Sequence, residues 1–353
     1  MLISFSHGMK RLVLWGLMAL VVCFVIWVDS LVYQSGMVDE DIYYAWVEGK
    51  RIASGENPYA RILSGDMRMN QKYATYFPLF YVLSALTQGI GFEEYPQWIS
   101  LWHRIFLGFE IGIGLTLFYV FHRLGMNALG FFSSLFWLFN RWTLEVVQIG
   151  HMDFIPLFFL IASLLSFRKH AEIALLLFSL SLGLKQIAVF LAPLYLVWIW
   201  HSPGKRNLKT LLSAMAIMMS VPALASLPFI LWDAEGFFKS ILFSVTRYPS
   251  DHFQAASVDV YLGLIGIPAK VPMLLLMTLV YYAALRRSIG MYTAALLVMF
   301  AFIDFNSVLF RQYMCWVVPL IPLSICDVLR ARGNEGNENP FGFAAERGEP
   351  KAF

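Results

Sequence analysis

The chain has 353 residues, of which 59% are hydrophobic and 14% are charged, and its formal net charge is +3. Soluble domains are about half apolar and about a quarter charged, so this composition excludes an ordinary soluble globular protein and predicts an all-α polytopic membrane protein. The net charge is too small to indicate a nucleic-acid partner. The three cysteines (Cys23, Cys315 and Cys326) lie in apolar segments without metal-ligand spacing, which predicts packing roles for them.

The first apolar run covers residues 12–28 and follows Lys10 and Arg11. A signal peptide has a similar outline, but this run is long for a signal-peptide core and no small-x-small cleavage motif follows it. We therefore expect an uncleaved first transmembrane helix.

A long polar stretch, residues 39–80, follows this helix. It opens with three acids, Asp39, Glu40 and Asp41, and continues with aromatic residues and a Gly-x-Asn-Pro-Tyr turn. An acid beside aromatic residues at a membrane surface can act as a general base toward a hydroxyl or as a metal ligand, and closely spaced carboxylates raise the pKa of one another. The simpler alternative is a solvated acidic patch that ends the first span.

Apolar segments recur along the rest of the chain. They cover residues 78–91, 98–121, 128–142, 154–167, 173–183, 187–200, 208–231, 271–285, 291–303 and 314–329. The pair 173–183 and 187–200 is compatible with a hairpin or with one long kinked element. A helix over residues 78–91 is about 21 Å long, which is short of the roughly 30 Å of hydrocarbon in a bilayer, so we expect it to lie on the membrane surface. Together with the first run, residues 12–28, the remaining segments predict about ten transmembrane helices.

The Lys/Arg distribution supports the same choice. With residues 78–91 on the surface, six basic clusters share one side, which the positive-inside rule identifies as cytoplasmic. They are Lys10 and Arg11, His122-Arg123, Arg168-Lys169-His170, Lys205-Arg206 with Lys209, Arg286-Arg287, and Arg330 with Arg332. Both termini are then cytoplasmic, and the connections 30–97, 145–153, 233–270 and 304–313 lie outside together with Lys185. We expect residues 1–332 to form one integral-membrane domain. The connection 233–270 is expected to lie along the membrane surface, and the polar tail 333–353 is expected to be disordered in the cytoplasm.

Several cations fall on the predicted outer side, against the general bias. They are Lys185, Arg247 and Arg311. Each can be an interfacial anchor whose charged end reaches the lipid headgroups. Alternatively, they bind a lipid phosphate, because arginine pairs phosphate oxygens bidentately and a cation stabilises a departing phosphate.

Further polar and aromatic residues are predicted to line an outer cavity. They are Glu40, Tyr43, Asn57, Tyr59, Arg104, His151, Asp153, His252 and Tyr313. For His151 and Asp153 the alternative is a capping role at the helix that begins at Phe154.

The polar stretch also resembles a known enzyme superfamily. Three patterns carry the resemblance: Asp39-x-x-Ile42-Tyr43, Gly55-x-Asn57-Pro58-Tyr59 and Tyr76-Phe77-Pro78-Leu79. They are similar to the first outer loop of the glycosyltransferase C (GT-C) superfamily, and more specifically to the polyprenyl-phosphate-mannose-dependent mannosyltransferases. The likeness continues weakly through residues 150–153 and 184–186. The chain departs from the usual pattern at Phe77, where many relatives have Pro, and at His151, where Gln is commoner.

The resemblance implies an integral-membrane glycosyltransferase. It would transfer a hexose, most simply mannose, with inversion from a polyprenyl-phosphate donor to a glycan, lipid or protein hydroxyl on the extracytoplasmic face. Asp39 corresponds to the catalytic acid, and Asp41 is the competing choice. A divalent metal (Mg²⁺ or Mn²⁺), where one is used, would bind these two acids. The alternatives are a lipid-linked-sugar transporter or flippase without transfer chemistry, and an assembly partner in an envelope complex.

Overall fold

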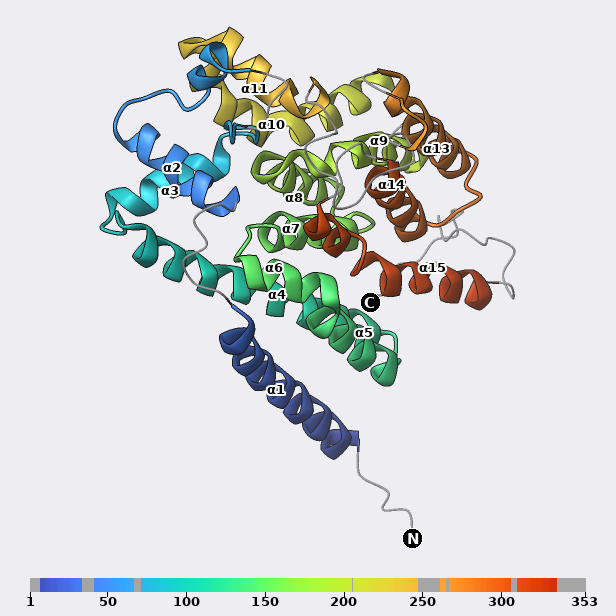
Figure 1. Cartoon of the computed structure of the whole chain (residues 1–353). Coiled ribbons are helices and arrows are strands. Elements are labelled where there is room, and N and C mark those ends of the chain that lie inside the picture. Colours follow the sequence, from blue (N-terminus) through green and yellow to red (C-terminus); the bar gives the residue numbers. More distant parts are fainter. Residues whose placement is uncertain are drawn as a thin grey trace.

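In the computed structural model (Figure 1) the regular secondary structure of the described residues is all helical, which confirms the predicted all-α class. The structure describes residues 7–33, 41–66, 71–204, 206–246, 261–264, 267–305 and 310–334. The predictions for Asp39, Glu40, Arg247, His252 and residues 335–353 lie outside these ranges. The described helices are α1 (His7–Val32), α2 (Asp41–Ala53), η1 (Ala60–Ser64), α3 (Leu79–Gly89), α4 (Tyr95–Arg123), α5 (Asn127–Phe139), α6 (Arg141–Ile149), α7 (Phe154–Ser166), α8 (Ala171–Leu184), η2 (Gln186–Leu191), α9 (Ala192–His201), α10 (Leu208–Trp232), α11 (Ala234–Thr246), α13 (Ile267–Leu285), α14 (Met291–Phe305), η4 (Arg311–Trp316) and α15 (Leu320–Asn334).

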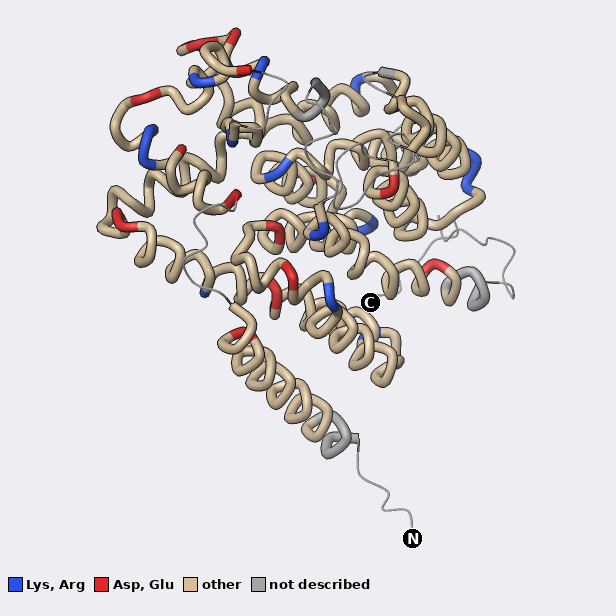
Figure 2. The backbone as a smooth tube through the Cα atoms, in the orientation of Figure 1, with Lys and Arg blue, Asp and Glu red and all other residues tan. Residues whose placement is uncertain are grey.

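Five helical stretches in the described part of the chain are long and apolar enough to cross a bilayer. They are Leu12–Val32, Tyr95–Arg123, Leu208–Trp232, Pro268–Leu285 and Arg311–Leu329. Their outer faces expose large apolar side chains, among them Leu12 (77% exposed), Leu224 (71%) and Leu279 (64%). Soluble monomers rarely expose apolar surface of this extent. Figure 2 shows that most of the helical length carries no charge. These five helices suggest a multi-pass membrane protein.

The apolar helices pack against each other in the pairs α4–α5, α7–α8, α8–α10, α13–α14 and α14–α15. The open choice for residues 171–201 is decided in favour of a hairpin. The Phe178 and Tyr195 rings lie 4.5 Å apart between centroids, and the Ser163 hydroxyl bonds both the Ala174 carbonyl and the Tyr195 hydroxyl. At the turn, Lys185 is extended (φ −153°, ψ 125°), so α8 ends before it.

The predicted segment 128–142 is wrong at its end, because two helices share it. Asn140 accepts hydrogen bonds from the Trp142 and Thr143 amides at 2.9 and 3.1 Å and thereby caps α6. Asparagine satisfies the first free amides of a helix in this way, so the chain ends α5 and starts α6. Helix α6 ends in turn at Gly150, whose left-handed φ of 60° turns the chain toward His151.

Helix α1 is attached to the rest of the molecule through a polar contact. Asp29 on α1 is buried, and its Oδ2 lies 2.8 Å from His103 Nε2 on α4. The Tyr33 ring stacks on the His103 ring, with 3.6 Å between the centroids. The carboxyl-terminal end of α1 is therefore fixed to α4 by specific contacts, and the rest of α1 extends away from it (Figure 1). Of the three cysteines, Cys315 and Cys326 are buried as the packing prediction requires, whereas Cys23 is exposed on α1.

The short helices α2, η1, α3 and α11 lie together at one end of the bundle (Figure 1). Helix α3 has 11 residues, in keeping with the predicted short segment 78–91, and it packs on α2. This contact is close at Gly49, where a Cβ atom would lie 2.3 Å from the Ser84 hydroxyl. Only glycine therefore lets α2 approach α3 at that point. Packing on α3 thus fixes the position of α2, whose first residue is Asp41.

Candidate functional site

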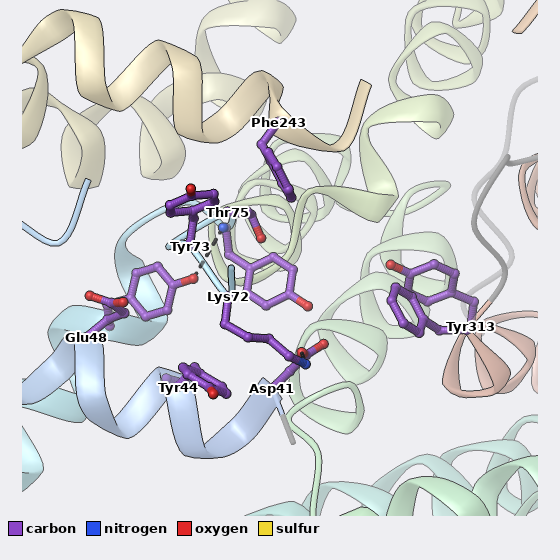
Figure 3. Close-up of a pocket in the computed structure, with 12 residues that line it drawn as sticks. Asp41, Tyr44, Glu48, Lys72, Tyr73, Thr75, Phe243 and Tyr313 are labelled. Carbon is purple, nitrogen blue, oxygen red and sulfur yellow. Dashed lines mark hydrogen bonds and ion pairs between the residues drawn. The ribbon is translucent and has the colours of Figure 1, made fainter. Parts of the chain in front are cut away.

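A cavity of about 60 Å³ lies where α2, residues 71–76, α11 and η4 meet (Figure 3). Aromatic rings form much of its wall, and among the lining residues Asp41, Glu48 and Lys72 carry charges. The full lining consists of Asp41, Tyr44, Ala45, Glu48, Lys72, Tyr73, Thr75, Tyr76, Tyr81, Phe243, Phe310 and Tyr313. Rings beside carboxylates can contact the apolar and the hydroxyl faces of a polar ring-shaped ligand at the same time.

Asp41, the first residue of α2, provides a carboxylate at this cavity. Its Oδ1 accepts a hydrogen bond from Lys72 Nζ at 3.0 Å, and 26% of its side chain is exposed. Burial alone would raise the pKa of Asp41, but Lys72, then His151 and Lys185 outweigh this effect and leave the pKa below its ordinary value. Asp41 is therefore ionised at neutral pH.

Behind Asp41 lies a buried charged network. His151 Nε2 is 4.0 Å from Asp41 Oδ2, and His151 Nδ1 is 2.5 Å from Asp153 Oδ2, although this second contact lacks the alignment of a good hydrogen bond. Lys185 Nζ donates to Asp153 Oδ1 at 2.7 Å, and Trp316 Nε1 donates to the same oxygen at 2.6 Å. Asp153 thus joins three segments that are far apart in the sequence.

Burial would raise the pKa of Asp153, but Lys185 and then His151 reverse this effect and hold the pKa well below its usual range. Asp153 is therefore a permanent anion inside the protein. Its partner Lys185 is also fully buried, and the ammonium lies 5.4 Å from the ring centres of both Tyr76 and Tyr313. Those two rings line the cavity, so the buried ion pair supports its wall.

A hydrogen bond also ties the turn after α8 to the non-helical segment 71–76. Gln186 Nε2 donates to the Thr75 carbonyl at 2.6 Å. Because residue 186 follows Lys185 directly, this bond fixes the buried lysine relative to Thr75 and Tyr76. Residues of four predicted outer connections, 30–97, 145–153, 304–313 and the turn at Lys185, therefore meet in one place.

The sequence-predicted site residues divide into two groups. Asp41, His151, Asp153, Lys185 and Tyr313 come together in the site just described. The other predicted residues that the structure describes lie outside it. Tyr43 packs its ring against Tyr95 and Trp46, and Arg104 bonds the Ser100 hydroxyl at 3.3 Å.

Asn57, Tyr59 and Arg311 also lie outside the cavity lining. Asn57 accepts from the Tyr59 amide at 3.0 Å, which stabilises its own turn. Tyr59 is fully buried, and its hydroxyl donates to the Tyr76 carbonyl at 2.7 Å. Arg311 is half exposed, and its Nη1 lies 3.7 Å from Glu145 Oε1. Arg311 follows Phe310, which lines the cavity, but Arg311 itself is not among the lining residues.

Sequence reasoning missed Lys72, Tyr76 and Trp316. Lys72 is a cation in the predicted outer stretch, so the argument that selected Lys185 would also have selected it. Tyr76 lies in a pattern already recognised as a family resemblance. Trp316 gave no signal, because a tryptophan within an apolar segment is ordinary lipid-facing or packing material.

A metal ion at the predicted pair Asp39 and Asp41 would need further ligands beside the Asp41 carboxylate. Within the described ranges no group of three or more His, Cys, Asp or Glu side chains could hold a metal ion. Asp41 has a lysine ammonium as its neighbour, and a cation beside Lys72 would be repelled. Asp39, the second acid of the predicted pair, lies outside the described residues. The described side chains therefore do not fit a metal site at Asp41.

Comparison of the chain with protein-family models, with curated proteins and with solved structures finds no match in any of the three.

Proposed function

We propose that this protein is an inverting membrane glycosyltransferase that uses a polyprenyl-phosphate hexose, with mannose as the first sugar to test. The observation that carries the proposal is Asp41, an ionised carboxylate beside Lys72 in an aromatic cavity at one end of an apolar helical bundle. In the proposed reaction the Asp41 carboxylate accepts the proton of the attacking hydroxyl, and the aromatic and charged cavity wall contacts the sugar. The apolar helices suggest a site at a membrane, where the lipid chain of the donor lies.

The proposed topology has about ten spans, with α2, η1, α3 and α11 on the extracytoplasmic surface and both termini in the cytoplasm. It is supported by the way the outer connections meet at Asp41, Asp153 and Lys185. It is also supported at the other end of the bundle, where His201 Nε2 lies 3.0 Å from the Leu285 carbonyl. His201 lies in a predicted cytoplasmic connection, and Leu285 is the last residue of the predicted span that precedes another such connection.

In the proposed reaction the acceptor oxygen attacks the anomeric carbon while the bond from that carbon to the phosphate oxygen breaks. The bonding electrons leave with the polyprenyl phosphate, and the acceptor proton passes to Asp41. A single displacement inverts the anomeric centre. Because the pKa of Asp41 is low, the carboxylate takes the proton late, when the hydroxyl has become acidic. Until then its negative charge stabilises the positive charge that develops on the sugar ring.

The leaving phosphate needs cations, and we assign this role to Lys72 and Arg311. Lys72 lines the cavity, and half-exposed Arg311 directly follows the lining residue Phe310 in the chain. Arginine can bind two phosphate oxygens at once. Lys185 was a predicted phosphate ligand, but its ammonium is buried in an ion pair with Asp153. We therefore assign it to positioning Tyr76 and Tyr313, and Arg247 remains a prediction.

The direct test is a transfer assay with the purified full-length protein in liposomes. Polyprenyl-phosphate mannose with a radiolabelled sugar is supplied together with cell-envelope glycolipid and glycan acceptors, and the label is followed into product. A flippase would instead move the intact donor across the bilayer without releasing polyprenyl phosphate. Transbilayer movement without release would therefore reject the transferase and select the transporter.

Lys72→Met is expected to move the acid limb of the pH–rate profile to higher pH. Lys72 is the strongest of the cations that lower the pKa of Asp41, and without it burial raises that pKa. Asp41 then becomes protonated at a higher pH and loses its function there. The pH dependence of kcat/KM measures this shift, because it reports groups of the free enzyme. Lys50→Met, which removes a cation from the helix that carries Asp41, serves as the control. An unchanged acid limb would remove Asp41 from the base role.

The proposed topology predicts opposite accessibility for Ser64 and Pro203. Both are exposed in the structure, in η1 and after α9 respectively. Single cysteines at these positions are placed in a chain whose Cys23, Cys315 and Cys326 are replaced by Ala. A membrane-impermeant maleimide applied to intact cells is expected to label position 64 only, and position 203 is labelled after the cells are opened. Labelling of both from outside contradicts this topology.

A further inference from the structure

Lys72 has an unusual backbone. Its φ angle is 55°, in the left-handed region that residues with a side chain adopt rarely and at an energetic penalty. Such a conformation persists only where the surroundings hold it. The same residue provides the ammonium that contacts Asp41 at 3.0 Å. The strained backbone therefore lies at the point where the direction of this ammonium is set.

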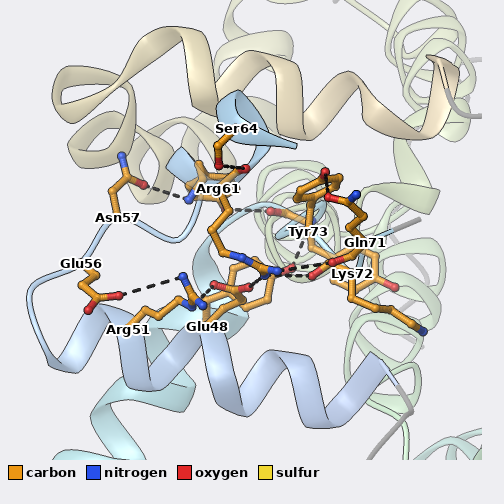
Figure 4. A network of polar contacts seen from close by, with 12 residues as sticks. Glu48, Arg51, Glu56, Asn57, Arg61, Ser64, Gln71, Lys72 and Tyr73 are labelled. Atoms are coloured by element: carbon orange, nitrogen blue, oxygen red, sulfur yellow. Dashed lines mark hydrogen bonds and ion pairs between the residues drawn. The ribbon is translucent and has the colours of Figure 1, made fainter. Parts of the chain in front are cut away.

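Arg61 holds this turn. Its Nη1 donates to the Lys72 carbonyl at 3.2 Å, and its Nη2 is 3.4 Å from the Gln71 carbonyl (Figure 4). One planar guanidinium thus bonds the two successive carbonyls that flank the Lys72 α-carbon, where the unusual φ angle lies. The Tyr73 ring lies 5.9 Å from the same guanidinium. Two bonds from a rigid fork fix the orientation of the turn, which a single bond would leave free to rotate.

Arg61 is anchored in turn by Glu48, whose Oε1 accepts from Arg61 Nη1 at 2.8 Å. Glu48 is 1% exposed, so its carboxylate has little water to replace this partner. Glu48 is seven residues after Asp41 on α2, which is two helical turns and hence the same helix face. One face of α2 therefore holds both ends of Lys72. Asp41 holds the ammonium directly, and Glu48 holds the carbonyl through Arg61.

We propose that Arg61, anchored by Glu48, is a positioning residue that fixes the strained Lys72 turn and so aims the Lys72 ammonium at Asp41. The inference rests on the proposed function for its catalytic meaning, but the positioning itself is a property of the fold. Without Arg61 the two carbonyls lose their donors, the turn relaxes to an ordinary conformation, and the lysine side chain leaves Asp41. Arg61 is not among the lining residues, so its removal takes no side chain out of the cavity wall.

The chain provides a matched control in Arg51. Its Nε lies 3.4 Å from Glu48 Oε2, and its side chain is 31% exposed, compared with 30% for Arg61. Arg51 therefore shares the anchor, the charge and the exposure of Arg61, but its other ion-pair partner is Glu56 and not the Lys72 turn (Figure 4). A general effect of removing a cation near Glu48 would appear in both variants.

The first experiment measures Lys72 itself, independently of any sugar transfer. The folded full-length protein is treated with an amine-reactive reagent, and the modification rate of Lys72 is followed by peptide mass spectrometry. An ammonium held against a carboxylate reacts slowly. We expect Arg61→Ala to raise the rate at least several-fold and Arg51→Ala to leave it unchanged. Equal rates in wild type and Arg61→Ala would overturn the positioning role, whatever the protein catalyses.

The second experiment uses the transfer assay and a double-mutant cycle. A misplacement of about 1 Å at a catalytic group can lower a rate by about 100-fold, so Arg61→Ala is expected to lower kcat by roughly 10- to 100-fold with little change in the donor KM. If Arg61 acts through Lys72, the variant Arg61→Ala/Lys72→Met is no slower than Lys72→Met alone. The proposal would be overturned if the fold losses in kcat of the two single variants multiply in the double variant. It would also be overturned if Arg51→Ala lowers kcat as much as Arg61→Ala.

Folding of each variant is checked by thermal unfolding in detergent. Should Arg61→Ala fold poorly, Glu48→Gln tests the same link from its other end, and it is expected to raise Lys72 reactivity in the same direction. The two hypotheses fail separately. A protein that transfers no sugar yet shows the reactivity change refutes the glycosyltransferase and keeps the positioning role.

Discussion

Asp41→Asn is expected to lower kcat for sugar transfer by about 10²- to 10⁴-fold, the range that a positioned proton acceptor contributes. The substitution keeps the size and shape of the side chain but removes the negative charge that faces the cavity. The amide can still accept a bond from Lys72 at the remaining oxygen, so the cavity keeps its form. The measurement is kcat from the initial rate of radiolabelled product at saturating donor.

Two further substitutions show whether this loss is specific. Glu56→Gln removes an acid that is 64% exposed in the same outer stretch and is expected to leave kcat within about two-fold, since surface pairs contribute little. Asp39→Asn tests the acid that the family resemblance favours. Loss of transfer in Asp39→Asn with full activity in Asp41→Asn would move the base two residues toward the amino terminus.

Lys185→Met is expected to reduce the free energy of unfolding by about 3–5 kcal/mol, the usual effect of breaking a buried ion pair. Both charged groups are fully buried, and removal of the ammonium leaves the Asp153 carboxylate with His151 and Trp316 alone. Chemical unfolding in mild detergent, followed by tryptophan fluorescence, measures the change. Lys239→Met is the matched control, because Lys239 and Glu235 form an exposed pair whose loss is expected to change stability by less than about 0.5 kcal/mol.

The double variant Lys185→Met/Asp153→Asn separates the charge from the shape of the side chain. Without the uncompensated anion, we expect much of the lost stability to return.

The contribution of Asp153 to stability depends on pH with a definite sign. Because the folded-state pKa of Asp153 is depressed, its contribution is fully present above the ordinary carboxyl range near pH 4 and is lost as the pH falls below that range. A Lys185→Met protein as stable as wild type at neutral pH would contradict this account.

The sequence was a good guide to the helices and a poor one to the break at Asn140. Residues 208–231 were expected as one span, and α10 covers Leu208–Trp232. Long apolar runs predict helices reliably because burial in lipid and backbone pairing favour the same structure. Asn140 went unnoticed because a cap depends on one side chain, and the apolar residues on both sides of it hide it in any average over a segment.

The site was harder to predict than the fold because its contacts are distant in the sequence. Asp41 and Lys72 are 31 residues apart, and Asp153 and Trp316 are 163 apart. Periodicity reports local structure, so it could nominate Asp41, His151, Asp153 and Lys185 singly but could not pair them. A cation on the predicted outer side was the signal that selected Lys185, and applied to every lysine it would have included Lys72.

The bond from Trp316 to Asp153 also has a consequence for biosynthesis. Ribosomes make a chain from its amino terminus, so Asp153 is made long before Trp316 emerges. During that interval Asp153 lacks the indole that donates to it in the folded protein, and only Lys185 and His151 can pair with it once they have been made. The polar cluster around Asp153 is therefore completed only after η4 has been made. A chain that terminates before η4 would leave the Asp153 carboxylate with one donor fewer.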